Sequence, residues 1–186
     1  MLDKITFVKS IPGTGDGMAV LDTLNHIQPA ESDSKAMVIW GDMVIKNPEF
    51  IFFCNYLSQS YFDKESFFIP LCFKENPYVF FERDKNKNIV TTRFNVRDEF
   101  INKGFTDFGF FFINPFFIRQ LLKNNLKTKP LKRIVKTLKG ELNFLDLIAH
   151  LYQIEKPAGY AVFNDNSSTM SFNTKAEAEQ ILNRLS

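Results

Sequence analysis

Short apolar runs of strand length alternate with segments of helical periodicity along most of this chain. After the turn GTGDGMA (13–19), apolar residues recur every three or four positions, which predicts a helix over 17–28. Further helices are predicted at 47–61, 115–125 and 141–153, and from Asn173 or Thr174 onward. Strands are predicted at 5–10, 36–42, 67–73, 108–114 and 159–164. This order predicts an α/β domain with a mostly parallel sheet and flanking helices.

A hairpin is expected to be inserted into this alternation. The segment YVFFERDKNKNIVTTRFN (78–95) has two apolar runs joined by the polar turn KNKN. No internal repeat or long linker interrupts the pattern, and 186 residues fit one domain with a sizeable core. We therefore predict a single domain over 1–186 with one inserted β-hairpin.

Charge and composition narrow the classes of partner. The net charge of +2 is too small to predict a nucleic-acid or membrane surface. Two cysteines cannot form a disulfide framework, and the first residues lack the pattern of a secretory signal. The longest aromatic stretch, FGFFFINPFFI, falls far short of the roughly 20 apolar residues of a membrane span. These features predict a soluble, cytoplasmic protein.

Three features could carry chemistry at the carboxyl ends of the strands, where α/β sheets bind ligands. Asp42 follows a buried strand and could hold Mg²⁺, or it could simply belong to a turn. Asn173 could be a ligand or only the N-cap of the last helix. The turn GTGDGMA lacks the lysine of a Walker A motif, and it could bind an anion, approach a base or be a plain loop.

The ordered set of motifs resembles the sugar-1-phosphate nucleotidyltransferases, most of all their N-acetylglucosamine-1-phosphate uridyltransferase domains, which have a GT-A-like α/β fold. The motifs that match are GTGDGMA, WGDMVI, TDFGFFFI, GELNFLDLI and SFNT, in this order. The resemblance runs from about residue 5 to residue 185. It implies Mg²⁺-dependent nucleotidyl transfer from a nucleoside triphosphate such as UTP to a sugar 1-phosphate.

The resemblance also implies a role for individual residues. Gly13 and Thr14 would contact the nucleotide base, and Asp42 and Asn173 would be the two protein ligands of Mg²⁺. Contacts with the sugar would come from Asn95, Asp107 and Gly109. The segment GELNFLDLI also matches its counterpart at Glu141 and Asp146.

Departures from the family pattern are equally informative. The family opens with a Gly-rich loop that cradles the triphosphate, and this chain has none. The family's Tyr-Gly-Arg turn near the sugar corresponds here to Tyr78-Val79-Phe80. A family Asn that contacts the sugar corresponds here to Asp107. Losing one hydrogen-bond donor to the transition state can raise the activation free energy by roughly 3 kcal/mol, and losing a whole loop should raise it further. We therefore expect turnover only if the loop is supplied. The alternative is a catalytically silent module that binds a nucleotide, a sugar phosphate or a protein.

A sheet without the strands that accompany this loop would expose an apolar edge. We therefore expect a second copy of the chain or another partner chain to cover that edge, or the segment 5–10 to enter it.

Overall fold

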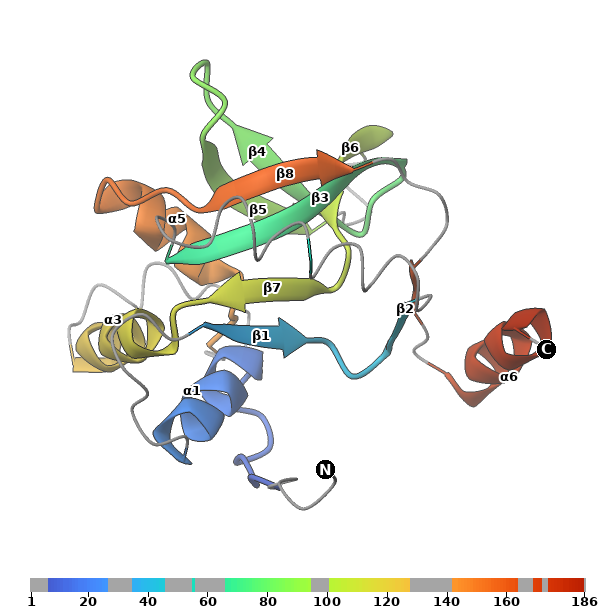
Figure 1. Ribbon diagram of the computed structural model, residues 1–186, viewed down its shortest axis with the longest axis horizontal. Helices are drawn as coiled ribbons and strands as arrows, with labels where there is room; N and C mark the ends of the chain where they lie inside the picture. The colour runs from blue at the N-terminus through green and yellow to red at the C-terminus, as the bar shows by residue number, and fades with distance from the viewer. Residues whose placement is uncertain are drawn as a thin grey trace.

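A mixed β-sheet forms the centre of the computed structural model (Figure 1), which describes residues 7–26, 35–45, 55, 66–94, 101–127, 142–163, 169–171 and 174–185. The sheet contains β1 (Ala36–Ile39), β7 (Phe110–Ile113), β3 (Phe67–Glu75) and β6 (Lys103–Asp107) in that order, and β8 (Gly159–Phe163) pairs with β3. Two small sheets join it: β2 (Met43–Ile45) with β9 (Thr169–Ser171), and β4 (Val79–Arg83) with β5 (Ile89–Phe94).

The strand directions do not confirm a mostly parallel sheet. β7 is antiparallel to both β1 and β3, and β6 is antiparallel to β3. Among the described strands of this sheet, only the pair β3–β8 is parallel. The prediction rested on the alternation of strands and helices, which is typical of parallel β–α–β units but does not by itself determine strand direction. The continuous apolar run of a strand buried on both faces does not determine it either.

Side chains of β7 show how both faces of the sheet are covered. All four of its residues are buried. Phe111 and Ile113 belong to a large core shared with the helices, whereas Phe110 and Phe112 join a second cluster with Phe68 on the opposite face. Because successive side chains of a strand point to opposite faces, FFFI supplies both cores at once.

Four helices lie in the described part of the chain: α1 (Asp16–His26), α3 (Pro115–Lys127), α5 (Asp146–Gln153) and α6 (Lys175–Leu185). Each follows the predicted periodicity, although α5 begins later than predicted. α3 starts at Pro115, and the Asn114 side chain accepts a hydrogen bond from the backbone N–H of Phe117 at 2.9 Å. None of these helices is long and apolar enough to cross a membrane.

Thr174 caps the last helix. Its hydroxyl accepts the backbone N–H of Glu177 at 3.2 Å, and the Glu177 carboxylate accepts the backbone N–H of Thr174 at 3.0 Å. This is the capping box that the sequence predicts, and it satisfies two helix donors. The helix therefore has its cap without the Asn173 side chain.

The hairpin β4–β5 lies where the sequence predicts one, and its turn is closed by Asp84. The Asp84 carboxylate accepts the backbone N–H groups of Asn86 and Asn88 at 2.9 and 2.8 Å. It also accepts the hydroxyl of Tyr152 from α5 at 3.1 Å. The guanidinium of Arg83 lies 3.9 Å from the centre of the Phe105 ring on β6. The hairpin is thus tied to both α5 and the main sheet.

The structure differs from the predicted elements in two respects, and one predicted helix falls outside the described residues. No strand is present at 7–10, where Phe7 is 93% exposed, so the described part of the segment 5–10 does not enter the sheet. Strands β2, β6 and β9 were not predicted. Apart from residue 55, the predicted helix at 47–61 lies outside the described residues.

Candidate functional site

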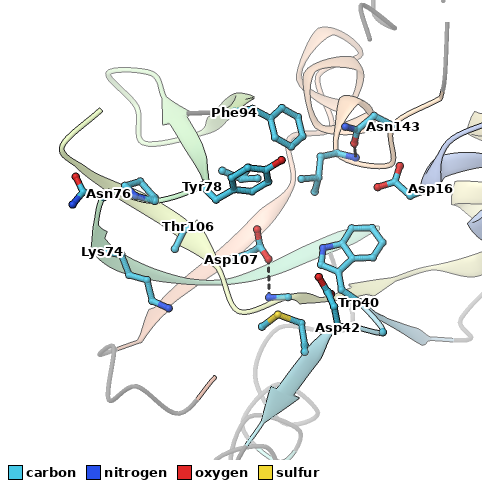
Figure 2. Close-up of a pocket in the computed structure, with 16 residues that line it drawn as sticks. Asp16, Trp40, Asp42, Lys74, Asn76, Tyr78, Phe94, Thr106, Asp107 and Asn143 are labelled. Atoms are coloured by element: carbon cyan, nitrogen blue, oxygen red, sulfur yellow. Dashed lines mark hydrogen bonds between the residues drawn. The ribbon is translucent and has the colours of Figure 1, made fainter. Parts of the chain in front are cut away.

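A cavity of about 850 Å³ opens where β1, β6 and the hairpin meet the first turns of α1 and α5 (Figure 2). Its charged lining residues are Asp16, Asp42, Asp107 and Lys74. Aromatic, amide and hydroxyl groups contribute the rest of its polar and ring surface: Trp40, Tyr78, Phe94, Asn76, Asn143 and Thr106. A cleft of this size is typical of a site for a small ligand.

Asp42, the predicted metal ligand, lines this cavity just beyond the end of β1. The backbone turns there because the N–H of Met43 donates to the carbonyl of Trp40 at 3.2 Å. The N–H of Trp40 donates to the carbonyl of Gly109 at 2.9 Å, which fixes the turn against the residue that directly precedes β7. Asp42 therefore belongs to a turn and also faces the cavity, so the two interpretations of this residue are compatible.

Asn173, the second predicted ligand, lies outside the described residues. The strand just before it is described, however: Ser171 of β9 pairs with Met43 of β2, the residue that follows Asp42. The strands β2 and β9, which adjoin the predicted ligands in the sequence, are thus neighbours, although they are more than a hundred positions apart in the sequence.

Asp107 and Gly109, two of the predicted sugar contacts, lie together on the cavity wall. The N–H of Gly109 donates to the Asp107 carboxylate at 2.6 Å. Burial raises the pKa of Asp107 to about 6, although this hydrogen bond and the charge of Lys74 favour the ionised form. Asn95, the third predicted contact, lies outside the described residues.

Gly109 is required by the backbone at this point. Its φ is +79°, a region that L side chains rarely adopt, and a Cβ there would overlap the side chain of Met43. The close approach between this glycine and Met43 brings the connection from β6 to β7 against the turn that carries Asp42. Gly109 thus has a structural role that is independent of any contact with a sugar.

The glycine-rich turn lies beside the cavity. Gly13 and Thr14 are not among the cavity-lining residues, but Asp16 of the same turn is. The Thr14 hydroxyl donates to the carbonyl of Ile11 at 2.7 Å, and its carbonyl accepts the N–H of Leu142 at 2.9 Å. Contacts of Gly13 and Thr14 with a base stay a prediction.

Asp16 joins the turn to the start of α5. Its carboxylate accepts the N–H of Phe144 at 2.8 Å. Nearby, burial and then the charge of Asp16 raise the pKa of Asp146, in the first turn of α5, to about 6. The motifs GTGDGMA and GELNFLDLI, which the sequence singled out separately, therefore form one wall of the site.

Aromatic rings on both sides of the cavity include two that sequence reasoning missed, Trp40 and Phe94. Trp40 is held by edge contacts with Phe111 and Phe144, with ring centres 5.4 and 5.8 Å apart. Tyr78 and Phe94 come from the two ends of the hairpin, and their ring centres are 5.7 Å apart. Because aromatic residues are frequent in this chain, residue type alone could not identify Trp40 and Phe94 as site residues.

No cluster of three or more His, Cys, Asp or Glu side chains that could hold a metal ion is found within the described ranges. A metal at Asp42 would therefore need ligands such as an amide oxygen, water or substrate phosphate. Those are the ligands that Mg²⁺ commonly takes.

No known family profile matches the chain, and no curated protein is similar to it. Solved structures do resemble it. HddC from Yersinia pseudotuberculosis has 12% sequence identity and a TM-score of 0.56, with 93% of this chain and 63% of that chain covered. The same protein complexed with GMP-PN gives 14% identity and a TM-score of 0.55, with 97% and 66% covered.

A nucleoside-diphosphate-sugar pyrophosphorylase from Vibrio cholerae RC9 has a TM-score of 0.58 at 11% identity, with 91% of this chain and 65% of that chain covered. The chain thus spans about two thirds of the length of these proteins. At such low identity, the similarity concerns the fold alone, and it supports the fold that the ordered motifs led us to expect. The chain has a nucleotidyltransferase-like α/β fold with a mixed sheet.

Proposed function

We propose that this chain carries the acceptor and metal half of a nucleotidyltransferase site. In the proposed reaction, an oxygen of a sugar phosphate attacks the α-phosphorus of a nucleoside triphosphate such as UTP. The bond to the β-phosphate oxygen breaks, and pyrophosphate leaves. Catalysis of this kind depends mostly on positioning and on charge neutralisation.

The observation that carries this proposal is the pairing of β2 with β9. Ser171 lies opposite Met43, so Asp42 and Asn173 are one and two residues from a paired position. This register supports the two side chains as joint ligands of one ion.

The donor set fits Mg²⁺, which prefers carboxylate and amide oxygens together with phosphate oxygens. When bound, the ion would supply positive charge beside the reacting phosphates. Asp42 would hold it at the cavity, and the backbone bonds of Trp40 and Met43 keep the Asp42 turn in place. The hairpin, with Tyr78 and Phe94, would bound the acceptor and exclude water from it.

The electrostatics of the cavity support the need for a further phosphate-binding segment. Three carboxylates and Lys74 are the charged side chains of the cavity lining, so the described wall offers little to offset a triphosphate. We therefore propose turnover only when a Gly-rich loop with a cation is present. The same observation favours a second candidate, a module that binds a nucleotide or sugar phosphate without turnover.

Calorimetric titration with UTP, CTP, GTP and ATP, with and without Mg²⁺, tests the proposal. We expect Mg²⁺-dependent binding of at least one nucleotide that is lost in Asp42→Ala. The matched control is Asp22→Ala on α1, a carboxylate outside the cavity lining, which should retain binding. Binding that is absent, or that survives Asp42→Ala, would refute the metal site.

Pyrophosphate release separates the two candidate functions. With N-acetylglucosamine 1-phosphate or another sugar 1-phosphate present, release that depends on Asp42 supports the enzyme. Binding without release supports the silent module.

A further inference from the structure

A buried hydroxyl on the cavity wall makes no hydrogen bond within the described part of the fold. Thr106, near the end of β6, is 8% exposed and is the only polar residue among the buried side chains of the described ranges. It lines the cavity, and its hydroxyl has no partner among the described residues. Removing a hydroxyl from water without a hydrogen bond is costly, so buried polar groups in proteins normally have a partner, which can be water or a ligand. We therefore look for the partner of Thr106 in the cavity.

Lys74 is the neighbour of Thr106 on the same face of the sheet. Cys72 lies opposite Thr106 in the pairing of β3 with β6, and Lys74 is two residues further along β3. Because side chains alternate between the faces of a sheet, Thr106 and Lys74 are diagonal neighbours, at a separation that a long side chain can span. Figure 2 shows both side chains in the same part of the cavity, beside Asp107. A ligand oxygen placed there could accept from the ammonium group and from the hydroxyl.

The charges in this part of the cavity favour a neutral ligand group. The charge of Lys74 acts on Asp107 and favours its ionised form, so the ammonium group and the carboxylate offset each other. A phosphate placed there would be attracted by Lys74 and repelled by Asp107. Lys74 can only donate hydrogen bonds, an ionised Asp107 can only accept them, and the hydroxyl of Thr106 can do both. Sugar hydroxyl groups, which donate and accept and carry no charge, match this set.

We propose that Thr106 and Lys74 are specificity-determining residues for the acceptor and bind a hydroxyl group of its sugar ring. This inference rests on the proposed function, because it names the residues that select the sugar in the same cavity. The family resemblance assigns a contact with the sugar to Asp107 but none to Thr106 or Lys74. The phosphate of the acceptor would lie towards Asp42 and its metal ion.

The variant Thr106→Val separates ligand binding from folding, because it replaces the hydroxyl by a methyl group of similar size. In calorimetry at pH 7.5 with Mg²⁺, glucose 1-phosphate or N-acetylglucosamine 1-phosphate should bind to it about tenfold more weakly than to the wild type, a difference of about 1.4 kcal/mol. The urea midpoint should stay the same or increase, because a buried hydroxyl without a partner in the fold is removed. A threonine with only a structural role would instead lower the midpoint and leave binding unchanged.

Two further variants are matched to Thr106→Val. Thr106→Ser keeps the hydroxyl and should bind the sugar phosphate nearly as well as the wild type. Thr23→Val removes a hydroxyl on α1 that donates to the carbonyl of Ala19 at 2.9 Å, outside the cavity lining, and should leave binding unchanged. Lys74→Met keeps most of the length of the side chain but loses the ammonium group, so it should weaken binding of the same sugar phosphate.

Deoxy analogues identify the hydroxyl group that is bound. One of the 2-, 3-, 4- and 6-deoxy forms of glucose 1-phosphate should bind about tenfold more weakly than the parent to the wild type, but equally well to Thr106→Val, because the partner is already missing there. Inorganic phosphate should bind equally to both proteins. The inference is overturned if neither sugar phosphate binds to the wild type, if Thr106→Val binds them equally well, or if inorganic phosphate shows the same loss.

Failure of this inference is distinguishable from failure of the proposed function. If Mg²⁺-dependent nucleotide binding is present and lost in Asp42→Ala, but sugar phosphates bind without regard to Thr106, only the assignment of Thr106 and Lys74 is wrong. If sugar phosphates bind through Thr106 but nucleotides do not bind, the metal and nucleotide proposal is wrong.

Discussion

Asp107→Asn should stabilise the protein at neutral pH, because the wild type keeps a buried charge there. Burial raises the pKa of Asp107 from 3.8 to about 6. A difference of about 2 units corresponds to about 3 kcal/mol, since each unit is worth about 1.36 kcal/mol. The variant retains an oxygen for the Gly109 N–H, so the gain is not offset by a lost hydrogen bond.

The sign and pH window follow from linkage. The folded state binds the Asp107 proton more tightly than the unfolded state, so this group costs nothing below about pH 3.8 and lowers stability as pH rises to about 6. The stability difference between Asp107→Asn and the wild type should therefore be small near pH 4, grow up to about pH 6 and level off above it. Asp146, whose pKa is also raised to about 6, is common to both proteins and cancels in the difference.

Urea unfolding followed by circular dichroism at several pH values between 4 and 8 measures this difference. With an m value of about 2 kcal/mol/M, the midpoint should increase by roughly 1.5 M at pH 8. Asp22→Asn is the matched control, because the Asp22 carboxylate likewise accepts one neutral hydrogen bond, from Ser10 at 2.7 Å. A variant less stable than the wild type at pH 8, or a difference that does not change with pH, would refute the reasoning.

Two further changes test the local structure. Gly15→Ala should lower the free energy of unfolding by about 3 kcal/mol or more, because φ is +92° and a Cβ would overlap the carbonyl of Leu142. Gly13→Ala should cost only about 1 kcal/mol, because φ is +80° but nothing lies within 4 Å of the added Cβ. Equal losses of stability in urea unfolding would contradict this difference. Thr174→Ala should remove one half of the capping box and lower the free energy of unfolding by about 1 kcal/mol in the same assay. Thr174→Ser keeps the hydroxyl and should cost less. A Thr174→Ala variant as stable as the wild type would argue against the cap.

Local signals predicted most elements correctly. The helical spacing of Leu21 and Leu24 predicted α1, and both side chains are buried in the main core. Pro115 predicted the first turn of α3, and Glu177 predicted the capping box of α6. Each of these signals acts within a few residues, where the sequence specifies the hydrogen bonds and the buried face directly.

Strand direction depended on information that is not local. β7 is antiparallel to its neighbours because of how the chain connects, and the run FFFI would be equally buried in a parallel sheet. β6, with the sequence KGFTD, is short and mostly polar, so it had no strand signal of its own. It is held by pairing with β3 from Leu71 to Glu75, a contact that no local pattern could reveal.

The candidate site shows the same division between local and long-range information. Asp42 could be chosen from the sequence because a carboxylate directly after an apolar strand is a local feature, and the structure places it in the cavity. Asp16 could not be chosen, since its place depends on a hydrogen bond with Phe144, 128 positions away. Trp40 and Phe94 could not be chosen by residue type, because aromatic residues are frequent in this chain. A binding site built from such residues follows from the fold, because the segments that carry them meet only through long-range pairing.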